Sequence, residues 1–160
     1  LPWSWPPNVW VGTSVESQKY APRLDCLARV PAKVRFVSVE PMLGPVDLRW
    51  WLTPRFDHCD EAINDCTGCD GLGPRPNGEC DAVVSPPILS WVIVGGESGH
   101  GARPIDLAWA RDLLEQCRVA SIPVFYKQGG ASNRCPHDTK GGHYECFPDN
   151  LKIREFPNGN

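Results

Sequence analysis

Four short apolar runs constrain the fold of this chain more than any other feature of its sequence. The runs are residues 9–16, 34–40, 91–97 and 123–128, and each is rich in β-branched and aromatic residues. Their hydrophobicity is near-continuous rather than alternating, which is typical of parallel strands covered on both faces. We therefore predict that these runs are strands of one parallel sheet.

Helical periodicity connects two pairs of these runs. Apolar residues recur at helical spacing within residues 17–30 and again within residues 104–121, where Pro104 occupies a plausible first helical position. Alternation of strand and helix predicts a parallel sheet with right-handed crossovers. Within these two helices we expect Cys26 and Cys117 to be small buried apolar residues.

The length and composition predict one α/β domain over residues 1–160 with one irregular excursion. The 160 residues are 41% apolar, which is enough to bury a core. The connection between the second and third runs is too long and too polar for a simple crossover. We therefore predict a cysteine-rich inserted loop at residues 53–87 within the domain.

Charge and hydropathy exclude several classes of partner. The formal net charge is −3, which gives no strong signal for nucleic acid or an anionic membrane surface. The sequence contains no apolar run near the roughly 20 residues that span a bilayer, and no signal peptide. The sequence predicts a cytoplasmic protein without a membrane partner.

Three of the predicted strands end in a glutamate. Parallel strands place all their carboxyl ends at one edge of the sheet, where ligands bind in both open sheets and barrels. Side chains two positions apart share a strand face, so each glutamate lies above a small residue. The pairs are Ser14 with Glu16, Ser38 with Glu40, and Gly95 with Glu97.

Converging carboxylates favour a binding or catalytic site at this edge. Together with Lys127 and Gln128 at the fourth strand end, Glu16, Glu40 and Glu97 could bind amino or hydroxyl groups, coordinate a cation or move a proton. We predict catalytic roles for the three glutamates and Lys127. The alternative is that the glutamates simply solvate the strand ends.

The loop at residues 95–99 reads Gly-Gly-Glu-Ser-Gly, but its spacing fits neither a P-loop nor a dinucleotide fingerprint. Arg103 lies beside the predicted start of the second helix, whose N-terminus favours anions. A carboxylate or phosphate of a ligand could therefore bind there. The alternative is a tight turn with Arg103 as a surface charge.

Several motifs together resemble a known family. Residues 8–16, 35–44, 91–99, 102–104 and 127–128 resemble a phage and prophage protein family of uncharacterised function with a radical-SAM-like barrel, and the resemblance extends to residues 140–142 and 154–157. The resemblance implies a partial parallel (β/α) barrel. It also implies an iron–sulfur cluster, held by three closely spaced cysteines near the family's N-terminus, that cleaves S-adenosylmethionine.

The family's cluster motif is absent from this chain, which begins with Leu1 rather than Met. We therefore expect the C-terminal part of a longer barrel, an enzyme fragment without its cluster ligands that forms half of an S-adenosylmethionine or substrate pocket. The alternative is a non-catalytic phage accessory protein with a structural zinc-binding insertion. The resemblance assigns cofactor binding to Ser14, Ser38, Gly95, Gly96, Ser98, Arg103 and Gln128.

The insertion contains a pattern typical of zinc knuckles. Cys66 and Cys69 lie in a C-x-x-C-x-G-x-G motif, in which two thiolates can chelate one tetrahedral ion. Cys80 is the natural third ligand, and Cys59 or His58 the fourth. Free or oxidised thiols and a disulfide are the alternatives to zinc.

A second group of cysteines and histidines lies near the C-terminus. Cys135 and His137 are separated by one residue, and His143 and Cys146 by two, in a glycine-rich segment. These residue types suit zinc, so a second site is one interpretation of the pattern. Ordinary polar residues are the interpretation that the family resemblance favours.

Overall fold

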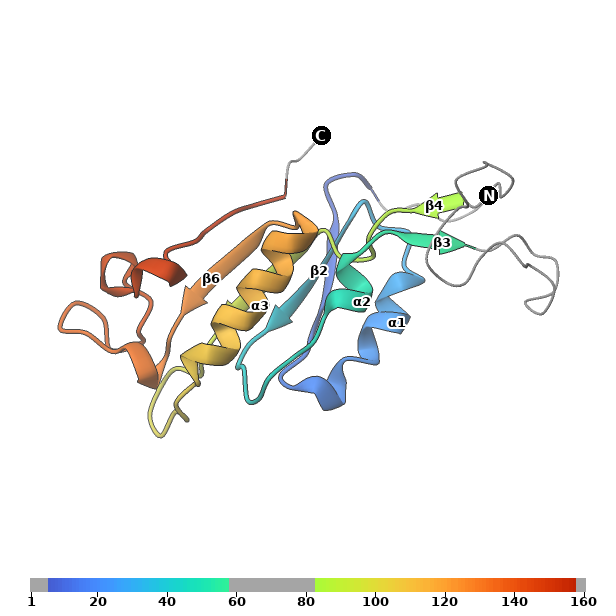
Figure 1. Cartoon of the computed structure of the whole chain (residues 1–160). Helices are drawn as coiled ribbons and strands as arrows, with labels where there is room; N and C mark the ends of the chain where they lie inside the picture. Colours follow the sequence, from blue (N-terminus) through green and yellow to red (C-terminus); the bar gives the residue numbers. More distant parts are fainter. Residues whose placement is uncertain (1–5, 58–82, 158–160) are drawn as a thin grey trace.

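The computed structural model describes residues 6–57 and 83–157, and its centre is a sheet of parallel strands (Figure 1). Within these residues the sheet has the order β1-β2-β5-β6. The strands are β1 (Trp10–Ser14), β2 (Val34–Val39), β5 (Trp91–Gly95) and β6 (Val124–Gln128), and all neighbours are parallel. The α/β class and the parallel sheet are confirmed.

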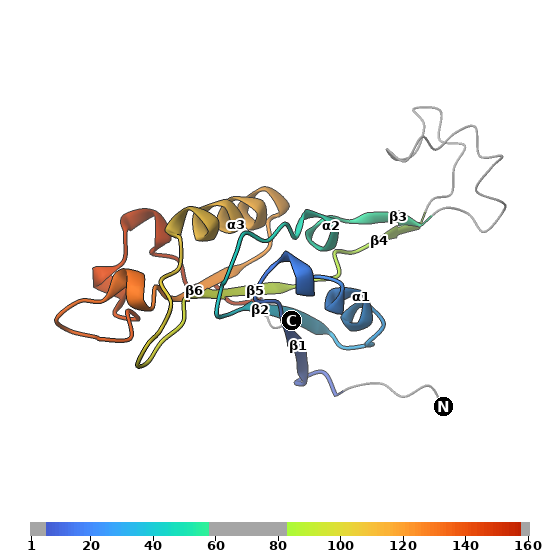
Figure 2. The same cartoon turned by 90° about the horizontal axis from the view of Figure 1, so that it is seen from below.

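Three helices lie along one face of this sheet (Figures 1 and 2). They are α1 (Arg23–Ala28), α2 (Arg49–Leu52) and α3 (Leu107–Ala120). Helix α1 packs on β1 and β2, and α3 packs on β5 and α2. In the two ranges that the structure describes, no helix has both the length and the apolar character needed to cross a membrane.

Both predicted helices begin later than the sequence pattern indicated. A short 3-10 turn, η1 (Gln18–Tyr20), precedes α1, and Pro22 occupies the N-cap position of α1 without a side-chain hydrogen bond. Helix α3 starts at Leu107 rather than Pro104, because the Asp106 side chain accepts a hydrogen bond from Ala108 N at 2.8 Å and caps the helix there. The prediction that Pro104 opens the helix is wrong, since Pro104 forms an isolated bridge with Gly130.

The core lies between the sheet and these helices. Alternate residues of β2, β5 and β6 face the helices and are almost completely buried, together with leucines of α1 and α3. They include Val37, Val39, Val92, Val94, Val124, Tyr126, Leu24, Leu27 and Leu113. Cys117 belongs to this core as predicted, whereas Cys26 is exposed because it lies on the outer side of α1.

The opposite face of the sheet, called the open face below, carries an aromatic layer. The Trp91 ring contacts the rings of Trp10, Phe36, Phe125 and Phe156 at centroid distances of 5.4–6.2 Å. No helix of the described residues covers this face, and Phe156 and Trp10 remain 59% and 38% exposed. The open face is therefore apolar at the level where β5 begins.

The C-terminal segment closes one edge of the sheet. It runs antiparallel to β6, where Tyr126 N donates to Ile153 O and Glu155 N to Val124 O, both at 2.9 Å. These bonds use backbone groups on the outer side of β6. Within the described residues β1 is therefore the edge at which the sheet can be extended, and closure into a barrel stays a prediction.

A small antiparallel ribbon lies at the two ends of the predicted insertion. Strand β3 (Arg55–Asp57) pairs with β4 (Val83–Ser85). The insertion's predicted zinc ligands lie between these strands and outside the described residues, so their role stays a prediction. They are Cys59, Cys66, Cys69 and Cys80, with His58 as the alternative to Cys59.

Candidate functional site

The predicted site residues gather where the four parallel strands end, an edge called the carboxyl edge below. Glu40 directly follows β2, Glu16 and Glu97 lie two residues beyond β1 and β5, and Lys127 and Gln128 end β6. The turn after β2 ties the edge together, since Met42 N donates to Gly95 O at 2.8 Å and Leu43 N to Glu16 O at 2.7 Å.

Glu40 is the centre of a polar cluster on this edge. Its carboxylate forms an ion pair with Lys127, with Nζ 3.0 Å from Oε1 and 3.2 Å from Oε2. Gln128 Nε2 donates to Glu40 Oε1 at 3.2 Å and to Gly96 O at 3.0 Å. The Glu40 side chain is 18% exposed, whereas the Lys127 side chain is 52% exposed. The carboxylate is therefore held in place while its cation faces solvent.

Gly95 makes room for Glu40. A Cβ atom at Gly95 would lie 3.1 Å from Cδ of Glu40, so the carboxylate occupies the space above this glycine. The sequence predicted open space for a ligand at this position. The small residue instead lets a long acidic side chain fold over the end of β5 and reach β6.

Glu16 forms a separate ion pair at the β1 end. Arg23 of α1 donates from Nη1 to Glu16 Oε2 at 3.1 Å and to Ser14 O at 2.9 Å, and its guanidinium lies 4.4 Å from the centre of the Tyr20 ring. Ser14 and Ser38 are direct neighbours in the sheet register. The first helix after β1 thus supplies the counter-ion for the acid at the end of β1.

Glu97 is paired with the cation predicted to bind a ligand. Its carboxylate accepts from Arg103 Nε at 2.7 Å, from Nη2 at 3.1 Å and from the Arg103 backbone N at 3.0 Å. These hydrogen bonds lower the pKa of Glu97 to about 2. Glu97 is therefore ionised at neutral pH, and as placed it suits binding of positive charge rather than proton transfer.

The glycine loop after β5 is shaped by a close approach of two backbones. A Cβ atom at Gly96 would lie 2.8 Å from Gly129 O, and one at Gly130 would lie 2.1 Å from Glu97 O. Gly130 also has a φ of +54°, which favours glycine. Ser98 is exposed in the turn that follows. The paired glycines therefore pack the loops after β5 and β6 against each other.

The loop at residues 129–147, called the Cys/His loop below, brings three metal-ligating side chains together. One ligand atom each from Cys135, His143 and Cys146 lies within 4.8 Å of the others, and all three residues are half-buried. This group could hold a metal ion. His137 stacks on His143 with ring centroids 4.9 Å apart. The hydrogen bond between the thiols lowers the pKa of Cys135 and raises that of Cys146.

The carboxyl edge and the Cys/His group both lie in the part of the chain that one family model matches. A family model described as a protein of unknown function, DUF5131, matches residues 2–146. The chain belongs to this family. No curated protein and no solved structure matches it. The matched residues of this DUF5131 chain include the carboxyl edge and all three members of the Cys/His group.

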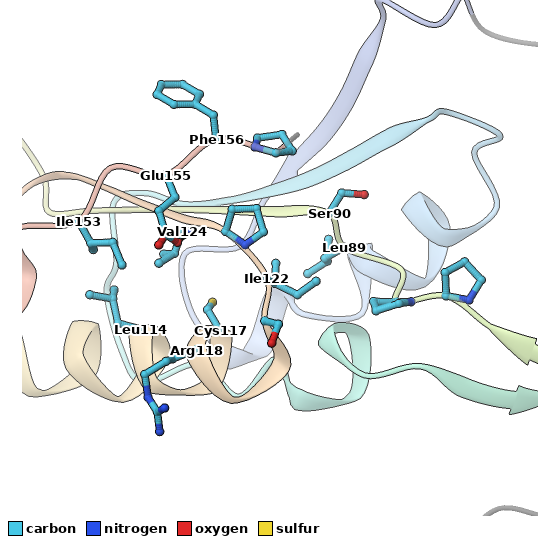
Figure 3. Close-up of a pocket in the computed structure, with 15 residues that line it drawn as sticks. Leu89, Ser90, Leu114, Cys117, Arg118, Ile122, Val124, Ile153, Glu155 and Phe156 are labelled. Carbon is cyan, nitrogen blue, oxygen red and sulfur yellow. Dashed lines mark hydrogen bonds between the residues drawn. The ribbon is translucent and has the colours of Figure 1, made fainter. Parts of the chain in front are cut away.

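A cavity of about 690 Å³ lies at the other end of this DUF5131 sheet, where β5 and β6 begin (Figure 3). Its lining includes Leu89, Cys117, Ile122, Glu155 and Phe156. The Glu155 carboxylate is used inside the fold, since it accepts from Val124 N at 3.1 Å. Burial and the nearby Glu155 charge raise the pKa of Cys117 to about 12, so this thiol is not a nucleophile at neutral pH.

The structure brings the predicted residues to one edge but divides them into separate groups. Glu40, Lys127 and Gln128 form one cluster, while Glu16 and Glu97 each pair with an arginine. The sequence pattern did not give Arg23 a role, although its position seven residues after the β1 glutamate, at the start of α1, was the available signal. It also left Gly130 without a reason, which the close approach of its backbone to Glu97 now supplies.

Proposed function

We propose that the carboxyl edge forms one half of a small-molecule pocket, for S-adenosylmethionine or its substrate, in a radical-SAM-like partial barrel of phage type. The observation that supports it best is the Glu40–Lys127 pair, which lies on the open face of the sheet and on the edge where α/β proteins bind ligands. A fixed carboxylate beside an exposed ammonium suits the amino and carboxylate groups of an amino-acid moiety.

The topology supports extension of this sheet into a barrel. Helices cover one face, as they do outside a barrel, and the open face would become the interior. Because the C-terminal segment uses the outer side of β6, further strands would join at β1. The aromatic layer around Trp91 would then close the amino end of the interior below the polar residues.

Each group at the edge has a role that its chemistry supports. Lys127 would bind the ligand carboxylate, and Glu40 would accept hydrogen bonds from its ammonium group. Glu16 and Glu97 would contribute negative charge to a cationic ligand such as a sulfonium where the ligand displaces their arginine partners. Ser14 and Ser38 lie below Glu16 and Glu40 on the open face and could donate hydrogen bonds to hydroxyl groups.

The described residues do not fit an iron–sulfur cluster. The cysteines described are Cys26, Cys117, Cys135 and Cys146, and among them Cys135 and Cys146 lie together with His143 rather than with a third cysteine. A cluster of the expected type needs three closely spaced thiolates. No reaction step is therefore assigned to such a cluster, and the proposal for this chain is ligand binding.

Amide chemical shifts recorded during a titration with S-adenosylmethionine test the proposal, with methionine as a second ligand. We expect shifts at residues 14–16, 38–42, 95–97 and 126–128. Glu40→Gln should weaken binding by about 10- to 100-fold, because one charge-assisted hydrogen bond contributes about 1.5–3 kcal/mol. Glu115→Gln, which breaks an exposed ion pair on α3, is the control. Shifts confined to the cavity at the amino ends, or no shifts, would contradict the proposal.

A further inference from the structure

The Cys/His loop has no apolar core of its own. Between Ala131 and Gly142 the loop contains no large apolar residue, and its elements there are a 3-10 turn, η2 (Ala131–Asn133), and a Cys135–Asp138 bridge. Asp138 shapes the turn by accepting from Lys140 N and Gly142 N, both at 2.8 Å. Small units without a core are commonly held by a metal or a disulfide.

The spacing of the ligand atoms fits a tetrahedral zinc ion. Ligands at about 2.3 Å for sulfur and about 2.0–2.1 Å for nitrogen, at a tetrahedral angle, lie roughly 3.5 Å apart. The distance between Cys146 Sγ and His143 Nδ1 is 3.5 Å. The third ligand atom, from Cys135, is within 4.8 Å of both. Small side-chain movements would therefore complete the coordination.

The ligand types select the metal. Two thiolates and one imidazole favour zinc over magnesium or calcium, which prefer oxygen ligands. His137 is exposed and its ring stacks on that of His143, so it lies next to the group without belonging to it. Zinc sites with three protein ligands take a water or a further side chain as the fourth.

We propose that Cys135, His143 and Cys146 bind one zinc ion that cross-links the two halves of the Cys/His loop beside the end of β6. The loop lies against the end of β6, because Arg154 donates to Lys127 O of β6 at 3.3 Å and to Gly142 O of the loop at 2.9 Å. Inside the loop, Gly129 N donates to Gly141 O at 2.8 Å. This site is distinct from the zinc knuckle predicted in the insertion. The proposal of this zinc site does not depend on whether the carboxyl edge binds S-adenosylmethionine.

Zinc content measured by mass spectrometry tests the proposal. The protein is purified anaerobically with reductant, in a background where Cys66 and Cys69 are serine, so that the insertion does not contribute. We expect one zinc per chain in this background and none after Cys135→Ser with Cys146→Ser. Cys26→Ser, which replaces an exposed cysteine on α1, should keep the metal. Background protein without zinc, or unchanged zinc in the double variant, overturns the proposal.

Two substitutions of the metal-ligating His143 distinguish loss of the metal from loss of the fold. His143→Ala should release the zinc, whereas His143→Cys should retain it because three thiolates still suit the ion. Far-UV circular dichroism should show the same helix and strand content in both variants. Equal zinc content in the two variants overturns the assignment of His143.

Cobalt substitution and thiol mapping complete the test. Cobalt in place of zinc should give the intense visible bands of a tetrahedral ion and a thiolate charge-transfer band, both lost in the Cys135→Ser, Cys146→Ser protein. A weak octahedral spectrum overturns the proposal. So does a Cys135–Cys146 disulfide found by alkylation and mass spectrometry in protein that was never exposed to oxidant.

Discussion

The carboxyl edge and the Cys/His loop lie next to each other but satisfy their charged and polar side chains in opposite ways. At the carboxyl edge each acid has a protein partner: Arg23 for Glu16, Lys127 for Glu40 and Arg103 for Glu97. In the Cys/His loop the thiols and imidazoles mainly contact one another. A ligand at the edge must therefore compete with existing ion pairs, whereas a metal in the loop would replace weak contacts with strong ones.

The two regions also differ in how their backbones are held. Ladder hydrogen bonds and paired glycines fix the carboxyl edge, so its side chains start from defined positions. Between residues 131 and 142 the loop is held mainly by turns around Asp138 and by the Cys135–Asp138 bridge. We therefore expect the edge to keep its structure without a ligand and the loop to depend on its metal.

Metal removal should produce the largest effect and should separate the two regions. Without zinc we expect amide hydrogen exchange of residues 131–146 to accelerate by about 100-fold or more, since a metal at 100 times its Kd stabilises the bound form by about 2.7 kcal/mol. Amides of β2 and β5 should be little affected. Hydrogen-exchange mass spectrometry before and after chelation measures both. Equal acceleration in the strands would contradict the separation.

Gly130→Ala should give the next largest effect, at the point where the two regions meet. The new Cβ would overlap Glu97 O at a φ of +54°, so the loops after β5 and β6 must move apart. We expect the free energy of unfolding to fall by about 2–4 kcal/mol, measured by urea denaturation.

A matched glycine distinguishes overlap from backbone strain. Gly99 also has positive φ, at +109°, but a Cβ there meets nothing within 4 Å. Gly99→Ala should cost about 1 kcal/mol from strain alone. Equal losses for the two variants would show that the close approach at Gly130 contributes little.

The sequence predicted the sheet well because its evidence is local. All four continuous apolar runs became strands with ends shifted by at most two residues. Within the described residues helices cover one face of these strands, and an aromatic layer rather than helices lies on the other. Helix starts depended on caps that periodicity does not show. Asp106 caps α3, so the helix begins at Leu107 rather than at Pro104. Cys26 lies on the exposed side of α1, a helix of six residues.

The sequence predicted where the candidate site lies but not which cation each glutamate pairs with. A glutamate at a strand end is visible in the sequence, and parallel strands fix its edge. Which cation it meets depends on the path of the chain after the strand. Glu40 meets Lys127 from β6 because Gly95 lets it cross β5, and that contact joins residues 87 positions apart.

Glu40→Gln should change ligand binding far more than stability. Lys127 is half exposed, and an ion pair of this kind contributes at most about 1 kcal/mol, so the urea midpoint should move little. Glu115→Gln, which removes the exposed pair with Arg118, should have a similar small effect on stability. A stability loss well above that of the control would mean that Glu40 is mainly structural.

The smallest expected effect is the pH response of Glu97. Its pKa in the folded chain is lowered to about 2, below the ordinary value of 4.5, by hydrogen bonds from Arg103. A carboxyl with a lowered folded pKa stabilises the fold above its unfolded pKa, and this contribution is lost as pH falls through the folded value. The contribution should therefore be full at neutral pH and disappear between about pH 4.5 and pH 2.

Arg103→Ala tests whether Arg103 alone lowers the pKa of Glu97 and so whether a cationic ligand could replace it. Without the guanidinium, the pKa of Glu97 should rise from about 2 toward 4.5, measured by carbon NMR of the side-chain carboxyl. Arg134→Ala, in the neighbouring Cys/His loop, removes a hydrogen bond to Gly99 O and should leave the pKa of Glu97 unchanged. If Glu97 kept its low pKa in Arg103→Ala, another cation would be compensating. If it rose, the acid at the β5 end would be held by one exposed arginine that a cationic ligand could replace, unlike Glu40, whose carboxylate is fixed from two sides.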